Sequence, residues 1–351
     1  MSAGILERSQ PSAQSLASRR AAAVDVGYGY TKAVSASGAK ACFPSVVAPG
    51  GTDLGLDGLL GGEGSGHAVK VRFLDGRKGE YLVGEAAQGS FLASGFLGAE
   101  KPADLHDLLL LTACALVGAG GRGPFPGQCD LAVGLPLAFY RAQKDALKAR
   151  LEGLAAWVSV DRGEEQYISF RRVLVIPQGA GVVFAQGLPQ GRGFAGVVDV
   201  GQYTTDFLLI DLRTMNPVVE ACGSVEAGCH LVAQRVGQAY LAKTGRPLPP
   251  RMERFVLDAA REGQPVPFRG KEIDLAADYE AAVRDVATTV SRQVLSVWRD
   301  VADMMSVTYL AGGGSLLLGE HLARALPNPA LVGDPVYANA LGYLRMLTGT
   351  A

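Results

Sequence analysis

The sequence carries the same short motif twice, once near its start and once past its middle. In the first copy, a run of small and apolar residues ends at Asp25, which is followed by Gly27 and Gly29. In the second copy, a similar run ends at Asp199 and is followed by Gly201. Each copy predicts a strand, a tight turn and a second strand, with an aspartate where the first strand ends. Two such hairpins predict two related lobes that face a single ligand.

Length and composition agree with a chain of two lobes. The 351 residues are 48% hydrophobic, which is enough for a sizeable core, and predicted strands alternate with predicted helices in both halves. We expect an α/β fold in which residues 21–177 and 334–351 form lobe I and residues 178–333 form lobe II. Residues 1–20, which are rich in Ser, Ala and Gln, are expected to be a disordered N-terminal extension.

Composition also argues against several functions. The net charge is −1 and no block of lysines or arginines is present, so we expect no direct contact with nucleic acid. The longest apolar run, residues 108–117, is too short to cross a membrane, and residues 1–20 lack the apolar core of a secretion signal. The five cysteines form no CxxC pair, which argues against zinc and disulfides and favours a cytoplasmic protein.

Other segments give expectations about local structure. Residues 49–66 are dense in glycine and predict a mobile surface loop, whereas residues 218–222 predict a strand. Residues 275–305 predict a long helix whose stripe of valines packs in the core. Three cysteines in apolar surroundings are expected to be buried: Cys42, Cys114 and Cys222. The four histidines show no metal-binding spacing and are expected at surface or capping positions: His67, His106, His230 and His321.

The chemistry of the two turns points to a phosphate ligand. Glycine lets the backbone come close to a ligand and direct N–H groups at phosphate oxygens. The aspartates suit a hydrated magnesium ion, which keeps most of its waters. One acidic glycine turn is common and usually structural, but three later features make the set more specific. They are a Pro-Gln-Gly-Ala turn at residues 177–180, Gly228 ahead of a helix, and a glycine triplet at residues 312–314.

These features, in this order, resemble the actin, Hsp70 and sugar-kinase superfamily of ATPases. The first hairpin is similar to the first phosphate motif of the superfamily in its actin form, and the second hairpin to the second phosphate motif. Residues 311–314 are similar to the adenosine motif. Four further segments are most similar to ParM/StbA-like plasmid-segregation actins and their archaeal relatives: residues 43–46, 81–85, 134–136 and 334–342.

The resemblance implies an actin-like (ribonuclease H-like) fold with a central nucleotide cleft, and it implies roles for individual residues. Gln178 would place the attacking water, and Asp25 and Asp199 would complete the catalytic set and hold Mg²⁺ largely through water. Lys32 would reach a phosphate oxygen as a compact charge. The residues expected to bind ATP or GTP are Asp25, Gly27, Tyr28, Gly29, Tyr30, Lys32, Gly201, Gln202, Tyr203, Thr204, Gly228, Gly312, Gly313, Gly314 and Ser315.

Four of these residues have an alternative role that the sequence leaves open. Lys32 could be an ordinary solvated strand lysine, and Gln178 could be a turn or capping residue. Gly228 either starts a helix that points at the nucleotide or relieves a tight turn. Ser315 either contacts the adenosine or caps its own helix, and both can hold together.

The chain departs from the family pattern at two places. Tyr28 stands where a small hydroxyl residue is usual, and Gln202 with Tyr203 replaces a small pair. Large side chains still permit contacts from the backbone N–H groups, but they crowd the position of the γ-phosphate. We therefore expect the departures to affect hydrolysis rate and nucleotide preference more than binding.

The resemblance implies a slow ATPase that uses Mg²⁺ and assembles into nucleotide-dependent filaments, which would segregate plasmid or other DNA through a DNA-binding adaptor protein. Residues 49–66 are the candidate contact between subunits. Two rival functions stay open. One is a small-molecule kinase. Such an enzyme needs an aspartate near the cleft that acts as a general base, and the candidates are Asp206 and Asp130. The other is a nucleotide-switched adaptor that forms no filament.

Overall fold

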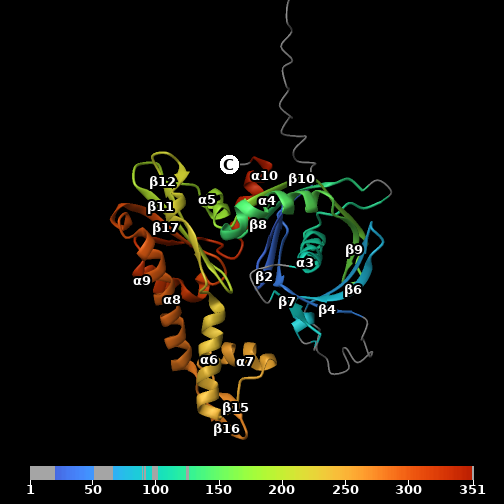
Figure 1. Ribbon diagram of the computed structural model, residues 1–351. Helices are drawn as coiled ribbons and strands as arrows, with labels where there is room; N and C mark the ends of the chain where they lie inside the picture. The colour runs from blue at the N-terminus through green and yellow to red at the C-terminus, as the bar shows by residue number, and fades with distance from the viewer. Residues whose placement is uncertain are drawn as a thin grey trace, which may run out of the picture.

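The computed structural model of the protein contains two α/β halves that stand side by side (Figure 1). The half built on a ten-stranded sheet is called lobe I below, and the half built on a six-stranded sheet is called lobe II. This two-lobed architecture agrees with the predicted fold class, whereas the boundary residues given above stay predictions. The structure describes residues 20–50, 66–88, 90, 92–96, 102–123 and 126–349.

Two segments with predicted behaviour fall largely outside the described residues. They are the N-terminal extension, of which only Arg20 is described, and the glycine-rich segment 49–66, of which only Pro49, Gly50 and Gly66 are described. The expectations for both segments therefore stay predictions.

The sheet of lobe I has the strand order β3-β2-β1-β8-β10-β9-β5-β6-β4-β7. Strand β1 is buried along its whole length because it lies between β2, to which it is antiparallel, and β8, to which it is parallel. The strands are β1 (Ala21–Val26), β2 (Tyr30–Ser35), β3 (Lys40–Pro44), β4 (Val46–Pro49), β5 (His67–Phe73), β6 (Lys78–Val83), β7 (Ser94–Gly95), β8 (Cys129–Leu135), β9 (Ala155–Val160) and β10 (Gln166–Pro177).

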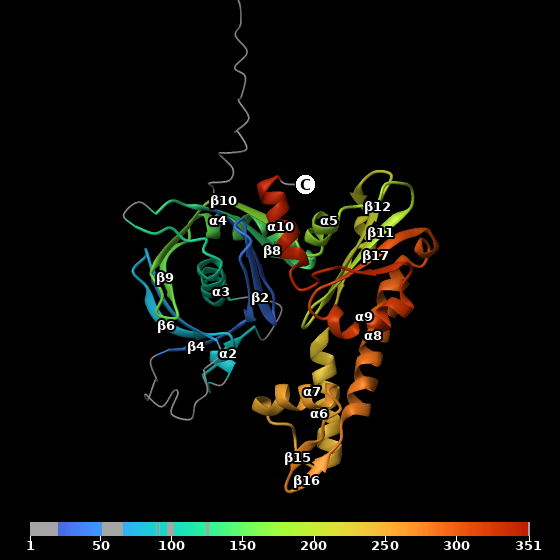
Figure 2. The ribbon, with the colours of Figure 1, turned by 180° about the vertical axis from the view of Figure 1, so that it is seen from behind.

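Helix α3 (Ala103–Leu116) lies inside the curve of the lobe I sheet, as the view from behind shows (Figure 2). It contacts β1, β2, β3, β9 and β10, and its central residues 108–115 are buried on every side. A helix that is apolar all round is stable only where it is covered all round. Helix α3 is therefore the centre of the lobe I core, with α2 (Glu85–Gln88) and α4 (Leu137–Glu152) outside it.

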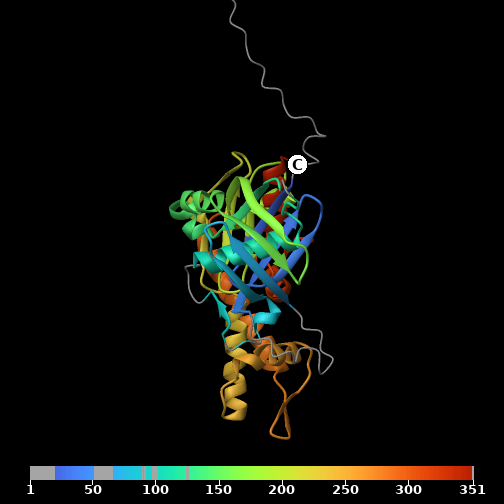
Figure 3. The same cartoon turned by 90° about the vertical axis from the view of Figure 1, so that its right-hand side faces the viewer.

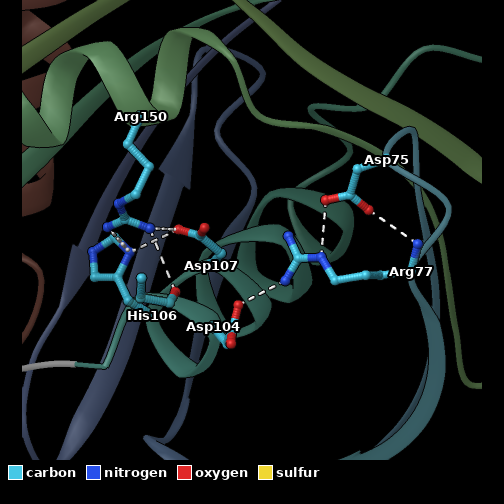
Figure 4. A network of polar contacts seen from close by, with 7 residues as sticks. Asp75, Arg77, Asp104, His106, Asp107 and Arg150 are labelled. Carbon is cyan, nitrogen blue, oxygen red and sulfur yellow. Dashed lines mark hydrogen bonds and ion pairs between the residues drawn. The ribbon is translucent and has the colours of Figure 1, made fainter.

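A network of charged side chains ties α3 to its neighbours (Figure 4). Arg150 of α4 pairs with Asp107 of α3, and its Nη2 lies 3.3 Å from Nδ1 of His106. Arg77, in the turn between β5 and β6, donates to Asp104 at 2.7 Å. The expectation of surface or capping positions for all four histidines is wrong for His106, which is only 5% exposed, because the sequence does not show that α4 covers this turn of α3.

The sheet of lobe II has the order β13-β12-β11-β17-β18, and β14 pairs with β12. Its strands are β11 (Phe194–Val200), β12 (Thr205–Asp211), β13 (Asn216–Pro217), β14 (Gly223–Val225), β17 (Met305–Ala311) and β18 (Pro329–Leu331). The two predicted hairpins take equivalent places, since β11 is antiparallel to β12 and parallel to β17, just as β1 is to β2 and β8. The sequence repeat is thus a repeat in the structure.

Helices pack on the lobe II sheet, and part of lobe II extends away from the sheet as an arm (Figure 3). The helices are α5 (Ala180–Gln186), α6 (Cys229–Thr244), α7 (Glu253–Arg261), α8 (Ala276–Trp298) and α9 (Ser315–Ala325). We call residues 229–280 the arm; it contains α6, α7 and the hairpin of β15 (Val266–Phe268) and β16 (Lys271–Ile273). Among all described residues, no helix is both long enough and apolar enough to span a membrane.

Two crossing helices join the lobes. Helix α5 follows β10, and α10 (Ala338–Thr348) packs on β1 and β8 of lobe I while it crosses α5. The crossing is a backbone contact, because a Cβ atom added at Gly342 would lie 1.7 Å from the carbonyl oxygen of Gly181. Val182 of α5 belongs to a buried cluster with Val197 and Leu208 of the lobe II sheet. The pair α5 and α10 is therefore the packed junction between the lobes.

Two predictions of local structure are wrong. Residues 218–222 form no strand but contain the 3₁₀ turn η1 (Val219–Ala221), and the helix predicted to reach residue 305 ends at Trp298. The indole of Trp298 is fully buried and donates to the carbonyl oxygen of Ala221 at 2.9 Å. The end of α8 thus packs on the η1 segment, and the periodicity within either segment does not show this long-range contact.

Burial of the remaining predicted core positions is mixed. The valine stripe of α8 is buried at Val283, Val286, Val290 and Val294, as predicted, but the prediction is wrong for Val297 in the last turn, which is 41% exposed. Among the cysteines, Cys114 is buried, Cys222 is half-buried and Cys42 is exposed. The expectation for Cys42 is therefore wrong. Short 3₁₀ turns η2 (Pro250–Met252) and η3 (Ala302–Met304) complete the described elements.

Candidate functional site

The first acidic turn is a closed loop at the end of β1. Asp25 lies opposite Lys32 in the β1–β2 hairpin, and the Lys32 Nζ atom is 3.5 Å from Oδ2 of Asp25. The turn closes through a hydrogen bond of 3.1 Å from the Gly27 N–H to the Tyr30 carbonyl. A Cβ atom at Gly27 would lie 2.7 Å from that same carbonyl oxygen, so the turn requires glycine there.

Ser45 holds this turn from the side of β3 and β4. Its side chain is fully buried, its hydroxyl donates to the Gly27 carbonyl at 2.6 Å, and its N–H donates to the Gly29 carbonyl at 2.9 Å. Thr31 adds a hydroxyl contact of 2.9 Å to Ser45. Because the carbonyl groups of Gly27 and Gly29 accept these hydrogen bonds from Ser45, the turn is held in one conformation.

The second acidic turn is built in the same way and rests on the start of α6. The Gly201 N–H donates to the Thr204 carbonyl at 2.9 Å. The first N–H groups of α6 are used on the turn itself, since Cys229 N–H donates to the Gly201 carbonyl at 3.2 Å and His230 N–H to the Gln202 carbonyl at 2.9 Å.

The choice left open for Gly228 is decided by this packing. A Cβ atom at Gly228 would lie 2.6 Å from the Gln202 carbonyl oxygen, so glycine is needed for α6 to approach the turn. Gly228 does not line the cavity described next. Glycine at this position permits the close approach of the α6 backbone to the second acidic turn, and the start of α6 points at that turn.

Both acidic turns face one cavity of about 410 Å³ between the lobes. All predicted site residues line it except Tyr203, Gly228 and Ser315. The predicted residues that the cavity brings together are Asp25, Gly27, Tyr28, Gly29, Tyr30, Lys32, Gln178, Asp199, Gly201, Gln202, Thr204, Gly312, Gly313 and Gly314. Residues that are distant in sequence, from both lobes and from the turn before α5, thus share one concave surface.

The two carboxylates at the floor of the cavity have different partners. Asp25 accepts a hydrogen bond of 2.8 Å from Nε2 of Gln178, and Asp199 accepts one of 2.6 Å from Nδ2 of Asn339. Burial and the nearby Asp25 carboxylate raise the pKa of Asp199 to about 6, against the opposite effects of Asn339 and Lys32. The negative charge of Asp25 thus disfavours ionisation of the Asp199 carboxyl group.

This pair of carboxylates fits a divalent cation. The raised pKa of Asp199 means that burial and the Asp25 carboxylate disfavour its ionised form, and a nearby positive charge would stabilise that form. Hard oxygen ligands are the type that Mg²⁺ prefers, and two carboxylates are enough for an ion that keeps several waters. No cluster of three or more His, Cys, Asp or Glu residues suited to a metal occurs in the described part of the chain.

The glycine triplet packs on the end of β11. Gly312 has φ +80°, and a Cβ atom there would lie 2.3 Å from Oδ1 of Asp199. The Gly314 N–H donates to the Val200 carbonyl at 2.9 Å, whereas Gly313 has open space around it and lines the cavity. The triplet thus forms a wall of backbone beside Asp199.

Ser315 turns away from the cavity. It is 2% exposed, and its hydroxyl donates back to the Gly312 carbonyl at 2.7 Å. It is the first residue of α9, whose cap position is Gly314. Its hydroxyl thus holds the glycine turn, and its contact with the nucleotide stays a prediction.

The unusual large residues of the two turns meet each other between the lobes. The ring of Tyr28 makes edge contacts with Phe96 at 5.9 Å and with Tyr203 at 6.0 Å, and Tyr203 also packs on His230. A Cβ atom at Gly29 would lie 2.7 Å from Cβ of Gln202. Tyr203 therefore does not line the cavity, and its ring instead packs against Tyr28 of the other turn.

Tyr28 also lines a second cavity of about 260 Å³, which lies beside α4. Gly134, Leu135, Phe139 and Arg150 are among its other walls. Burial and the nearby Asp206 carboxylate raise the pKa of the Tyr28 phenol. Tyr28 is thus the partition between the two cavities.

Sequence reasoning missed several residues of the cavity. Those without any assigned role are Cys42, Val200, Cys229, Arg261, Tyr279, Leu316, Leu317, Pro335, Val336 and Asn339. Most come from the arm, from α9 or from the segment before α10, and their place depends on long-range packing. Pro335, Val336 and Asn339 are the exceptions, because they lie in the segment 334–342 that was singled out by resemblance.

The two aspartates considered as bases for a kinase lie in different places. Asp206 lines the cavity, is 4% exposed and accepts a hydrogen bond from the Ser224 hydroxyl. Asp130 lies at the other end of β8 and accepts two hydrogen bonds from Arg171, at 3.0 and 2.5 Å. Only Asp206 can take part in chemistry at this site.

Comparison with known proteins agrees with the fold and the cavity. Residues 23–181 match the family described as "Actin like proteins N terminal domain", and residues 197–324 match "Archaeal actin homologue MreB-like, C-terminal". An archaeal actin homolog of Thermoplasma acidophilum is 28% identical over 329 residues, which are 91% of this chain and 96% of the relative.

Solved structures give the same result. A chain of a 15-stranded ParM filament from Clostridium botulinum superposes with a TM-score of 0.81 at 25% identity, covering 94% of this chain and 99% of that one. An archaeal actin homolog in complex with ADP superposes with a TM-score of 0.72 at 26% identity, covering 93% and 98%.

Proposed function

Because the chain belongs to the actin-like protein family, we propose that it binds Mg²⁺–ATP in the cavity between its lobes, hydrolyses it slowly and assembles into filaments. One observation carries the proposal: the two acidic glycine turns of different lobes face a single cavity. The relative that was solved with ADP has the same overall fold, which supports a nucleotide as the ligand.

Each part of the cavity has a physical role in this proposal. Backbone N–H groups of the two turns would hold the β- and γ-phosphates from opposite sides, and Lys32 would add a positive charge. Mg²⁺, held by Asp25 and Asp199 through water, would neutralise phosphate charge when bound. Glycines 312–314 would let the adenosine end lie against backbone.

Gln178 is the residue proposed to place the attacking water. A side-chain amide both donates and accepts, so it can orient a water molecule without removing its proton. Its Nε2 atom already donates to Asp25, which fixes the direction of the amide toward the cavity floor. Catalysis would thus come from positioning and from charge stabilisation.

Filament assembly is proposed from the relatives. The C. botulinum ParM chain, which superposes over nearly its whole length, was solved as a filament. A head-to-tail contact between identical chains grows into a polymer when its rotation does not close a ring. A DNA-binding adaptor, a role in plasmid segregation and a cytoplasmic location are the finer parts of this proposal.

The test measures phosphate release and pelleting of the purified chain with Mg²⁺ and either ATP, ADP or a non-hydrolysable analogue. We expect slow phosphate release from ATP and pelleting that depends on the nucleotide at tens of micromolar protein. Calorimetry with ATP and with GTP shows which base is preferred. Absence of binding to both nucleotides, with Mg²⁺ present, would exclude the proposal.

A small-molecule kinase is the second candidate, and the position of Asp206 favours it. This buried carboxylate lines the cavity and can accept a proton from a substrate hydroxyl. ATP turnover that stays at the basal rate until a small metabolite is added would support the kinase. Turnover that follows polymer formation would support the filament.

A further inference from the structure

Asn339 joins the two functional parts of the cavity, and no role was assigned to it above. It lies in the first turn of α10, is 6% exposed and lines the cavity. Its Nδ2 donates to Oδ2 of Asp199 at 2.6 Å, and its Oδ1 accepts the N–H of Gly179 at 2.9 Å. One short side chain therefore contacts the second acidic turn and the turn before α5.

The chemistry of the two partners fixes the orientation of this amide. A carboxylate only accepts, and a backbone N–H only donates, so the nitrogen must face Asp199 and the oxygen must face Gly179. A flipped amide would lose both hydrogen bonds. Because Asn339 is buried, water cannot replace either partner without cost.

The contact with Gly179 bears on Gln178, the residue immediately before it in the chain. Gly179 has φ +83°, which is a backbone conformation that glycine tolerates and that turns the chain sharply into α5. On the other side of the turn, Gln178 donates to Asp25. Hydrogen bonds thus link Asp199 to Asn339 and Asn339 to the backbone of the turn. The Gln178 side chain of the same turn then links to Asp25.

We propose that Asn339 is a positioning residue that holds the Asp199 carboxylate and the Gln178 turn in a fixed relation. The inference rests on the proposed function, since it concerns how the same site is set up for Mg²⁺ and for water. Loss of the amide would free Asp199 to rotate and would loosen the turn that carries Gln178. Partners that orient a metal-binding carboxylate typically change metal affinity or activity by about 10- to 100-fold when removed.

The first experiment measures binding and not turnover. Asn339→Leu keeps the approximate size of the side chain and removes both hydrogen bonds. Binding of a fluorescent ATP analogue is measured as Mg²⁺ is titrated, and we expect the Mg²⁺ concentration at half-saturation to rise by about tenfold. Asn328→Ala is the control, because it removes a part-buried side-chain hydrogen bond of 2.6 Å to the Met305 carbonyl in lobe II, away from the cavity.

The second experiment tests the link to Gln178 by a double-mutant cycle on kcat. If Asn339 positions Gln178, then Gln178→Ala costs much less in the Asn339→Leu background than in the wild type. A change in stability alone would leave the two effects independent. Asn339→Asp serves as a second variant, because it keeps the acceptor for Gly179 and replaces the donor to Asp199 with a carboxylate oxygen that repels it. Its kcat at saturating Mg²⁺ and ATP is expected to fall by about tenfold.

The outcomes separate this inference from the proposed function. If wild type binds the analogue and hydrolyses ATP, but Asn339→Leu shifts the Mg²⁺ midpoint no more than Asn328→Ala, the inference is wrong and the function stands. Independent effects in the cycle, with unchanged kcat in Asn339→Asp, overturn it as well. If wild type binds no nucleotide with Mg²⁺ present, the function fails and the inference fails with it.

Discussion

The side-chain amide of Gln178 donates a hydrogen bond of 2.8 Å to Oδ1 of Asp25, across the floor of the cavity. Asp25 lies near the end of β1 and Gln178 follows β10, and these two strands are separated in the sheet only by β8, which is parallel to both. This contact fixes the amide of Gln178 and leads to the first prediction.

Gln178→Ala is expected to lower kcat by roughly a hundredfold, because misplacement of the attacking water by about an ångström has an effect of that size. Nucleotide affinity should change little, since the phosphate contacts come from the turns. Steady-state phosphate release and calorimetry measure the two quantities. Gln186→Ala, at the exposed C-terminal end of the helix α5 that follows Gln178, is the control. An equal loss of affinity and kcat would contradict the role.

Lys32→Met is expected to weaken ATP binding by about tenfold or more, because a hydrogen bond to a charged group contributes roughly 1.5–3 kcal/mol. Lys70→Met is the matched control: Lys70 is also a strand lysine paired with a carboxylate, at 2.8 Å from Glu80, but it is exposed and outside the cavity. Calorimetry with Mg²⁺–ATP compares the two variants. Equal affinities would show that Lys32 is an ordinary strand lysine.

The stability of the nucleotide-free protein is expected to depend on pH through Asp199, whose pKa is raised to about 6. A raised carboxyl pKa means that the folded chain keeps a proton that the unfolded chain has already released. The contribution of this group to the free energy of unfolding therefore falls as pH rises from about 4 to about 6, by about 3 kcal/mol, and is constant above. Urea unfolding across this range, compared with Asp199→Asn, isolates the effect. A difference between the two proteins that is independent of pH would contradict it.

Gly342→Ala is expected to destabilise the junction of α5 and α10 by about 3 kcal/mol or more, because the new methyl group would meet the backbone of Gly181. Gly237→Ala in α6 is the control, since a Cβ atom there meets nothing within 4 Å. Alanine in a helix interior is favoured over glycine by about 1 kcal/mol, so the control should gain stability. Thermal and urea unfolding decide whether the two variants differ in sign.

Tyr28 and Tyr203 are expected to couple the two lobes. Their rings meet edge to face at 6.0 Å, and such a pair contributes about 0.5–1.5 kcal/mol beyond the area it buries. The coupling energy from a double-mutant cycle with leucine at each position should fall in that range. X-ray scattering of the nucleotide-free double variant should show a larger radius of gyration. Additive effects with no change in shape would mean that the contact does not hold the lobes together.

Most of the site could be predicted because its motifs are local. A strand that ends in aspartate and glycine specifies its own turn, and the Gly27 and Gly201 turns each close within four residues. Glycine triplets and helix starts are equally short-range features. The order of these motifs along the chain was enough to indicate two lobes around one cavity.

The rest could not be predicted because it depends on contacts between distant elements. Arg261 and Tyr279 reach the cavity only because the arm folds beside it, and Asn339 does so because α10 crosses α5. Trp298, the last residue of α8, donates a hydrogen bond to Ala221, and no periodicity in either segment reveals this contact. Ser315 looked like a ligand contact by position, yet its hydroxyl is used on Gly312.

Because the arm is long, a small rotation at its base moves its far end by a larger distance. Helix α6 alone has 16 residues, or about 24 Å at 1.5 Å per residue, and it starts directly on the second acidic turn. A tilt of about 10° at its root would move its far end by about 4 Å, which is enough to change which residues a neighbouring molecule can touch. A shift of less than an ångström beside a phosphate would thus be magnified at the outer rim of the protein, where a second copy could sense it.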